Sequence, residues 1–349
     1  MTEGTHSQRG RIQVVGFDPE RVTGREPITD WSDSIGTETE SRWKRAYRRF
    51  LRNRSALIGL AVVSIMALAA FFARPITLGG IPIQPFSLAP YDPTTILYLE
   101  VDPTVNVYDW PSAQHLMGVD GSGRDLFSRI LYGGRYSISI GFVVVVLTAS
   151  FGIIYGSVSG YYGGWVDEIL MRIVDTIYAF PGLVLALLIV TMFGGGYWQL
   201  VLAFSLFGWN SYARIMRGEV LSVKESEYVK AARALGARDR RIIMRHVVPN
   251  AMAEVLVVAS LNIGVIVIGV AALGFLGLGM PPGTAEWGTM LDQTRETLIQ
   301  GPEGQIPWHA TLFPGLAIFL FVMSMNMIGD GINDALDAQE TSVTAGGTK

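Results

Sequence analysis

The sequence of 349 residues contains no cysteine, which excludes disulfide bonds, thiolate metal sites and a catalytic thiol in this chain. Histidine is scarce as well. The four histidines stand far apart, at His6, His115, His246 and His309, without the spacing of metal ligands. We therefore expect that this chain binds no metal and no cofactor of its own.

The sequence also lacks a P-loop. In that motif a glycine-rich turn ends in Gly-Lys, so that backbone amides and the lysine hold phosphate. The lysines of this chain are Lys44, Lys224, Lys230 and Lys349, and none of them follows a glycine. If the chain depends on ATP, a separate subunit must hydrolyse it. No catalytic cluster stands out either, so we do not expect an enzyme.

Charge is sparse, and its signs are segregated along the chain. Only 16% of the residues are charged, 50% are hydrophobic, and the mean hydropathy is +0.35. This composition is typical of an integral membrane protein in a lipid bilayer. The net charge of -3 averages over basic and acidic segments and says little about partners, and no nucleic-acid partner is expected.

Apolar runs of about 20 residues, the length of one membrane crossing, predict an all-α integral membrane fold with six transmembrane helices. We place the crossings at residues 54–74, 137–160, 176–193, 198–215, 254–273 and 311–329, with a kink at Pro181 and a short internal turn at residues 161–175. Basic residues favour the cytoplasmic side, and they concentrate in residues 42–54 and 214–245. Both termini are therefore expected in the cytoplasm.

This topology divides the chain into a few segments. They are a cytosolic tail with a basic lead-in (1–53), the first helix (54–74), an external loop (75–135), a five-helix core (136–330) with a cytoplasmic loop (214–248), and a cytosolic tail (331–349). The external loop is rich in proline, which disfavours helix, so we expect extended structure there. It is placed either to contact an external binding protein or to cover the helices.

The crossings lack ionisable residues at their centres. Asp175, Glu219, Glu254 and Asp330 all fall near predicted ends. A carrier driven by protons typically has carboxylates or histidines at mid-membrane, so their absence weighs against a secondary carrier. A membrane enzyme or scaffold built on the same six helices is the other alternative.

The strongest local feature is the basic segment from Glu227 to Asn250. Good helix formers predict a helix from Tyr228 to Leu235, and Gly236 suits the left-handed position just past its end. A second short helix is expected from Arg238 to His246, with Pro249 ending it. Charge alone fits an ordinary cytoplasmic loop. The small Ala231 and Ala232, however, would let a partner approach the backbone.

Three motifs resemble one family. The pattern of Ala231-Ala232, Gly236 and an apolar run closing on Pro249 resembles the EAA loop of ABC-importer permeases, although Lys230 replaces the usual Glu. The string HLMGVDGSGRDLFSRILYGGR, residues 115–135, resembles the signature of the C-type subunits of dipeptide and oligopeptide permeases, with Val119 in place of Thr. The FLGLG-x-x-PP-x-x-x-WG and GDG-x-x-DALD strings also resemble it, so the matches span residues 115–337.

The resemblance implies a transmembrane domain of the type I ABC importer fold, in the plasma membrane of a prokaryote. The chain would pair with a second, homologous permease subunit, two ABC ATPase subunits that hold ATP and Mg, and an external solute-binding protein. Transport would proceed by alternating access. Coupling to the ATPase would depend on residues of the basic segment from Glu227 to Asn250. They are Tyr228, Ala231, Ala232, Gly236, Arg238 and Pro249. Dipeptides, oligopeptides, nickel complexes and oligosaccharides remain possible solutes.

Polar residues inside the crossings are candidates for the solute path. We single out Trp209, Asn262 and Asn326, with the alternative that each bonds a neighbouring helix instead. Gly152, Gly156 and Gly160 fall four residues apart and predict a smooth stripe for close helix contact.

Overall fold

The computed structural model describes residues 42–78, 81–295, 297 and 306–337. The chain divides into two compact units, Met1–Arg45 and Ala46–Lys349. Of the first unit only residues 42–45 are described, and they begin helix α2 (Arg42–Phe50). Most of the predicted amino-terminal tail and residues 338–349 of the predicted carboxyl-terminal tail therefore lie outside the described residues.

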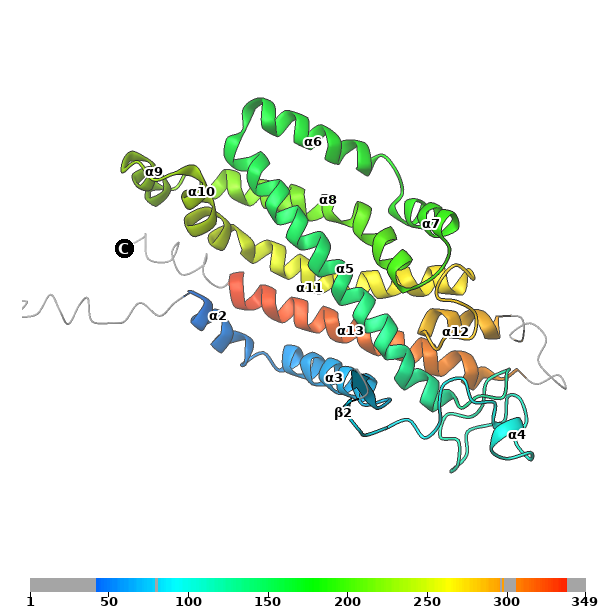
Figure 1. The fold of residues 1–349 in the computed structure, drawn as a ribbon. Coiled ribbons are helices and arrows are strands. Elements are labelled where there is room, and N and C mark those ends of the chain that lie inside the picture. The colour runs from blue at the N-terminus through cyan, green and yellow to red at the C-terminus, as the bar shows by residue number, and fades with distance from the viewer. Residues whose placement is uncertain (1–41, 79–80, 296, 298–305, 338–349) are drawn as a thin grey trace, which may run out of the picture. The chain divides into compact units, whose positions relative to one another are not determined.

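Helices make up most of the described second unit (Figure 1). After α2 the elements are α3 (Arg54–Phe71), β1 (Ile76–Leu78), β2 (Ile81–Gln84), α4 (Leu97–Glu100), α5 (Leu126–Tyr162), α6 (Gly164–Tyr178), α7 (Gly182–Phe193), α8 (Tyr197–Val223), α9 (Glu227–Ala234), α10 (Asp239–Ile242), the π-helix η2 (Ile243–Val247), α11 (Val248–Phe275), α12 (Trp287–Thr294) and α13 (Trp308–Asp337). Helices α9 and α10 lie at one end of this unit, and α4 with its loops lies at the opposite end.

The long helix α5 packs along α8 through the predicted glycine stripe. A Cβ atom at Gly156 would lie 2.3 Å from the carbonyl oxygen of Ala213, and one at Gly152 would lie 2.5 Å from Cβ of Tyr212. Only glycine permits this approach, so the prediction of close helix contact is confirmed. The apolar core continues across α11, α12 and α13, where Trp287 and Phe321 are buried.

The chain has long apolar helices, as expected of a membrane-spanning protein. Judged by length and composition, however, fewer helices in the described part of the chain can cross a membrane than the six expected from the sequence. Among the described residues, four segments are long and apolar enough to cross a membrane: Arg54–Phe71, Leu126–Tyr162, Asp239–Phe275 and Trp308–Leu336. Helices α6 and α7 together make a fifth if their 78° bend lies within one span. The bend follows Tyr178 and includes Pro181, which confirms the predicted kink.

Two predicted loops are helical in the structure. The short turn expected at residues 161–175 is wrong, because α6 occupies Gly164–Tyr178. Its run of Trp, Ile, Leu, Met and Arg sustains a helix once Gly163 and Gly164, both with positive φ, have turned the chain. The external loop expected to reach residue 135 ends earlier, since Asp125 caps α5 by accepting a hydrogen bond from the Ser128 amide.

The expectation that Pro249 ends a helix is also wrong. Proline has no N–H and crowds the carbonyl four residues earlier. The chain meets this constraint with η2, in which the Val248 amide donates to the Ile243 carbonyl, five residues back. Pro249 then stands in the first turn of α11, where its missing N–H costs nothing. The helical path therefore runs on from α10 into the membrane-spanning α11.

Candidate functional site

At the α4 end, the GVDGSGRD signature forms a buried polar clamp. Asp120 accepts hydrogen bonds from the backbone amides of Ser122 (2.8 Å) and Arg124 (3.0 Å). Its second carboxylate oxygen accepts from Nε of Arg124 at 2.9 Å and lies 3.2 Å from Nε of Arg129. All three charged side chains are at most 9% exposed. One carboxylate thus organises two buried guanidinium groups.

The two arginines tie this loop to α12 and to the segment between α11 and α12. Nη1 of Arg129 donates to the carbonyl oxygens of Pro93 (2.9 Å) and Gly283 (3.2 Å). Nη2 of Arg124 donates to the side-chain oxygen of Gln293 at 2.9 Å. The clamp therefore joins segments more than 150 residues apart. Its role in this chain is to hold the loops at the α4 end together.

The other charged residue of the signature starts helix α5. Asp125 accepts from the amide and the hydroxyl of Ser128, and its other oxygen lies 3.1 Å from Nδ1 of His115. A carboxylate at a helix amino terminus also satisfies free backbone donors. These contacts explain why Asp and Ser stand three residues apart in the motif.

At the opposite end of the unit, α9, the turn at Gly236 and α10 form the element that the sequence marks for coupling. Gly236 has φ of +77°, the left-handed conformation predicted for it, and a Cβ atom there would meet nothing within 4 Å. Arg238 precedes α10, and its carbonyl oxygen accepts from the amides of Arg241 (2.8 Å) and Ile242 (3.1 Å). The helix, turn and helix expected from the sequence are present up to Ile242.

This coupling element has an inner face and an outer face. Val229 and Ile242 are fully buried in a cluster with Tyr212, Met216 and other residues of α5, α8 and α11. Ala232 packs against the same cluster and is half-buried, whereas Ala231 is exposed. The outward side therefore includes Ala231 but not Ala232.

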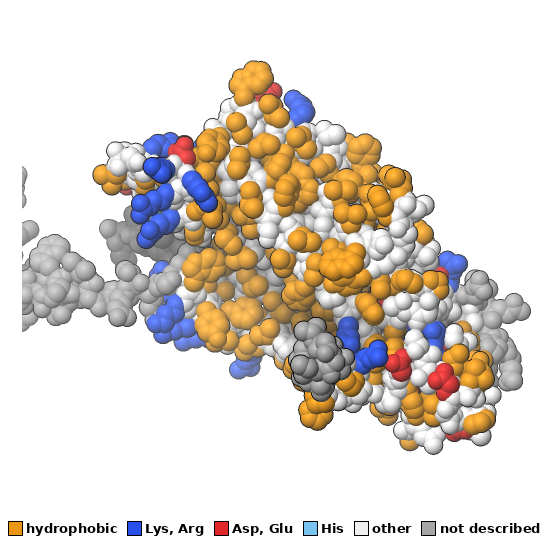
Figure 2. Space-filling model, viewed as in Figure 1, with side chains coloured by type: hydrophobic (Ala, Val, Ile, Leu, Met, Phe, Trp, Pro, Cys, Tyr) orange, Lys and Arg blue, Asp and Glu red, His pale blue; other side chains and the backbone are white. Residues whose placement is uncertain are grey.

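The outer face combines basic and apolar groups. Leu235 is 88% exposed and Tyr228 is 47% exposed. Lys and Arg side chains gather over α9 and α10, whereas hydrophobic side chains cover the middle of the same view (Figure 2). The outer face therefore presents an exposed leucine and a half-exposed tyrosine among basic side chains.

Polar contacts hold the coupling element on the helices. The Tyr161 hydroxyl at the end of α5 donates to Asp239 of α10 at 2.7 Å. Just before the element, at the end of α8, Nζ of Lys224 donates to the carbonyl of Gly160 in α5 at 2.8 Å. The Arg233 guanidinium lies 5.4 Å from the centre of the Tyr161 ring, and interaction with this tyrosine raises the pKa of Arg233 above its ordinary value. A displacement of α9 would thus act on α5 and α8 directly.

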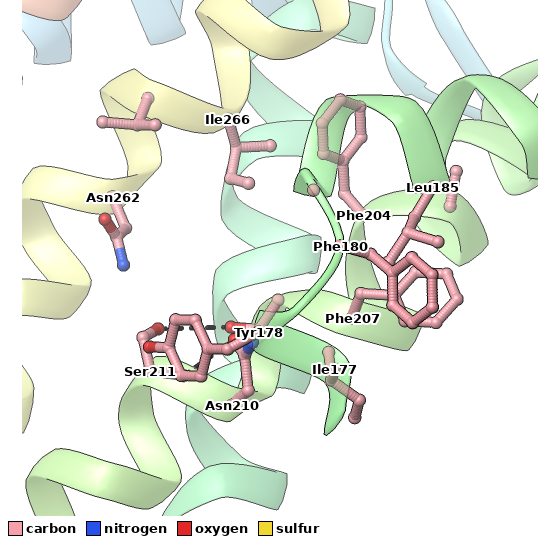
Figure 3. Close-up of a pocket in the computed structure, with 14 residues that line it drawn as sticks. Ile177, Tyr178, Phe180, Leu185, Phe204, Phe207, Asn210, Ser211, Asn262 and Ile266 are labelled. Atoms are coloured by element: carbon pink, nitrogen blue, oxygen red, sulfur yellow. Dashed lines mark hydrogen bonds between the residues drawn. The ribbon is translucent and has the colours of Figure 1, made fainter. Parts of the chain in front are cut away.

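A pocket of about 280 Å³ lies between α6, α7, α8 and α11 (Figure 3). Its lining is apolar and aromatic except for Tyr178, Asn210, Ser211 and Asn262, and no charged residue belongs to it. In Figure 3, Tyr178, Asn210 and Ser211 lie together on one side, while Phe180 and Phe207 lie on another. A few polar groups in an apolar hollow are typical of a small-molecule site.

The three candidate path residues separate in the structure. Asn262 lines this pocket, and its amide donates to the Tyr212 hydroxyl at 3.0 Å. Trp209 is not among the lining residues; its ring packs on Phe151 and Tyr155, and its Nε1 donates to the Leu206 carbonyl. Asn326 is exposed on α13 and is not a lining residue either.

Sequence reasoning missed Asn210 and Ser211, which line the pocket next to Asn262. Their signal was present, since two adjacent polar residues interrupt an apolar crossing directly after Trp209. Within the described ranges no group of three or more His, Asp or Glu side chains is placed to hold a metal ion.

Comparison with known proteins gives a consistent relationship. The family described as "Binding-protein-dependent transport system inner membrane component" matches residues 152–341, more than half of the chain. The family "N-terminal TM domain of oligopeptide transport permease C" matches residues 41–111.

Two relatives are similar to this chain over most of its length. The glutathione transport system permease protein GsiD of Pectobacterium atrosepticum is 39% identical over 295 residues, covering 84% of this chain and 90% of that protein. The protein of the same name from Shigella dysenteriae is 38% identical over 300 residues, covering 86% and 91%. A solved structure of the inward-facing MetNI methionine ABC transporter covers 58% of this chain and 96% of that chain, with 15% identity and a TM-score of 0.46.

The family resemblance inferred from the motifs is thereby confirmed. The chain belongs to the inner membrane components of binding-protein-dependent transport systems: it is an ABC-importer permease subunit of the oligopeptide permease C type, in the peptide/nickel family, and a multi-pass bacterial inner-membrane protein without an ATPase domain of its own.

Proposed function

We propose that this permease carries di- or oligopeptides, or a related small solute such as glutathione, across the membrane by alternating access. Its family implies separate ATPase subunits, an external binding protein and a second permease. The names of the GsiD relatives support a peptide solute. The solute path would lie between this chain and the second permease, with Asn262 and its pocket on the side of this chain.

The transmembrane arrangement we propose has six crossings and both termini in the cytoplasm. Four long apolar helices and the bent pair of α6 and α7 account for five of them. Helix α8 would be the sixth, since its 27 residues extend for about 40 Å. The exposed basic coupling element would then lie inside, as the positive-inside rule requires. Residues 85–125 would form the external surface.

The observation that carries the mechanism is the two-faced coupling element. Its buried face is joined to α5, α8 and α11, and its outer face exposes Leu235, Ala231 and basic side chains. We propose that this outer face docks on an ATPase subunit, so that closure of the two ATPases moves α9 and, through it, the attached helices.

Replacing Ala231 by Arg tests this docking. The added side chain points away from the core, so the subunit should insert and fold as before while contact with the ATPase is lost. We expect ATP hydrolysis stimulated by the loaded binding protein to fall at least ~10-fold, the effect of losing about 1.4 kcal/mol of contact energy. Recovery of ATPase subunits with the tagged chain should fall in parallel.

Two further variants complete the design. Ala113→Arg is the matched control, because Ala113 is an exposed alanine in the loop between α4 and α5. Helix α4 and its loops lie at the far end of the unit from α9. The control variant should retain the ATPase subunits. Ala232→Arg is expected to impair folding as well as docking, since Ala232 is half-buried. Full coupling in a properly inserted Ala231→Arg variant would refute the docking proposal.

A further inference from the structure

An ion pair stands at the edge of the pocket without belonging to its lining. Asp175 of α6 and Arg214 of α8 are 39 residues apart in sequence, and Nη2 of Arg214 donates to the Asp175 carboxylate at 2.7 Å. The side chains are 57% and 50% exposed, respectively. The Arg214 guanidinium carbon also lies 4.2 Å from the centre of the Tyr178 ring.

This ion pair is joined to the pocket at two points. Tyr178, beneath the guanidinium, is a lining residue, and so is Ser211, which precedes Arg214 by about one turn of α8. The pocket itself has no charged lining residue. Arg214 therefore supplies positive charge at the end of the pocket that lies along α8 toward α9.

A second ion pair between α6 and α8 serves as a comparison, because its charged groups link the two helices. Asp167 of α6 takes both Nε and Nη2 of Arg217 and also accepts from the Ser159 hydroxyl. These two charged side chains are only 16% and 32% exposed. Asp167 is thus saturated by partners within the chain and needs no solute.

Arg214 differs from Arg217, because most of its N–H donors make no hydrogen bond to the described residues. A guanidinium has five N–H donors in a planar fork that matches a carboxylate with two parallel hydrogen bonds. Within the described part of the chain, the hydrogen bond to Asp175 uses Nη2 alone. A charged pair this exposed in a membrane protein faces water or another polar group rather than lipid. The arginine is therefore open to an anionic group that enters the pocket.

We propose that Arg214, stacked on Tyr178, is a binding residue for the free carboxylate of the transported solute. The solute carboxylate would displace Asp175, which holds the guanidinium over the ring while the pocket is empty. The amide and hydroxyl groups of Asn262, Asn210 and Ser211 would meet peptide groups, and the phenylalanines would meet apolar side chains. This inference rests on the proposed peptide transport and narrows its solute to peptides with a free carboxyl terminus.

The test measures binding to the permease itself, so that selection by the binding protein does not interfere. The complete complex, with second permease and ATPases, is placed in lipid nanodiscs without binding protein or ATP. Equilibrium binding of radiolabelled trialanine is compared with that of its C-terminal amide. We expect the wild type to bind trialanine at least ~10-fold more tightly, and Arg214→Gln to bind the two probes within about twofold of each other.

Three variants separate a binding residue from a helix link. Arg214→Lys keeps the charge without the fork and should retain a reduced preference for trialanine. Asp175→Asn removes the competing carboxylate and should strengthen trialanine binding, whereas a mere link between α6 and α8 would be weakened equally by either change. Arg172→Gln is the control, because Arg172 is exposed on α6 and does not line this pocket. It should behave as wild type.

The outcomes are distinct. A wild type that binds both probes equally or neither, or an Arg214→Gln complex that still prefers trialanine, would overturn the carboxylate site. If Arg214→Gln does not assemble, weaker trialanine binding by Asp175→Asn would overturn it as well. Loaded binding protein and ATP are then added to the same nanodisc preparations, and the stimulation of ATP hydrolysis is measured. Its absence in the wild type would refute the proposed importer function instead.

Discussion

The two ends of this permease use charged residues in opposite ways. In the clamp at the α4 end, Asp120, Arg124 and Arg129 are buried and pair with one another and with nearby carbonyl groups. In the coupling element, the basic side chains are exposed, and the anchoring is done by buried apolar residues such as Val229. Charges that are buried with their partners hold the loops of the chain together, whereas the exposed charges of the coupling element lie on the face that we propose docks on an ATPase subunit.

The largest effect should follow from breaking the clamp. Arg129→Ala leaves the buried Asp120 with one arginine fewer, removes the arginine donor to the Pro93 carbonyl, and leaves the Gly283 carbonyl with Arg124 alone. Removing one partner of a buried ion pair typically costs about 3–5 kcal/mol. We expect a clearly lower thermal unfolding midpoint and poor recovery of the purified chain in detergent. Arg240→Ala, at an exposed arginine of α10, should unfold at the same temperature as the wild type. Equal midpoints for the two variants would contradict the contrast between the buried charges of the clamp and the exposed charges of the coupling element.

An intermediate effect is expected at the turn of the coupling element. Gly236→Ala meets no neighbouring atom, so its cost is the left-handed backbone alone, about 1–2 kcal/mol. The variant should insert normally but reposition α9, which lowers ATP hydrolysis stimulated by the binding protein severalfold. Gly218→Ala is the matched control, since Gly218 is inside α8 and an added Cβ also meets nothing there. Unaltered stimulation in Gly236→Ala would show that the turn tolerates other geometries.

The smallest effect is expected at the position that departs from the family pattern. Lys230 pairs with Glu225 at 3.1 Å, and both side chains are mostly exposed. Exposed pairs contribute about 0–1 kcal/mol. Lys230→Glu should therefore leave the unfolding midpoint unchanged and alter stimulated ATP hydrolysis by less than about twofold. A large loss that Glu225→Gln does not reproduce would mean that Lys230 contacts the ATPase directly, which would sharpen the assignment of the outer face.

Much of the fold was predictable because its signals are local. Hydropathy over some 20 residues located α3, α11 and α13, and the spacing of Gly152, Gly156 and Gly160 predicted the contact of α5 with α8. The helix and glycine turn around Ala231 and Gly236 follow from propensity and backbone freedom. The errors occurred where two local rules competed. Proline predicted a helix end at Pro249, but the preceding π-turn allowed the helix to continue.

The site was less predictable than the fold. Asn262, Trp209 and Asn326 were chosen on the same grounds as candidates for the solute path, and that role stays a prediction for all three. The structure places only Asn262 at the pocket, whereas Trp209 packs on aromatic rings and Asn326 is exposed on α13. A polar residue within an apolar run looks the same in sequence whether it faces a pocket, a neighbouring helix or another subunit. Its direction depends on the rotation of its helix against the others.

The sequence by itself determined that this chain is a helical membrane protein of the permease family, because composition, hydropathy and motif spacing are properties of neighbouring residues. Only the tertiary structure decided which charges meet. Arg129 reaches Gly283 across 154 residues, and Arg214 reaches Asp175 and Tyr178 on another helix. Such contacts depend on how distant helices pack, and packing turns one arginine inward to a carboxylate while it leaves the other open at the edge of a pocket.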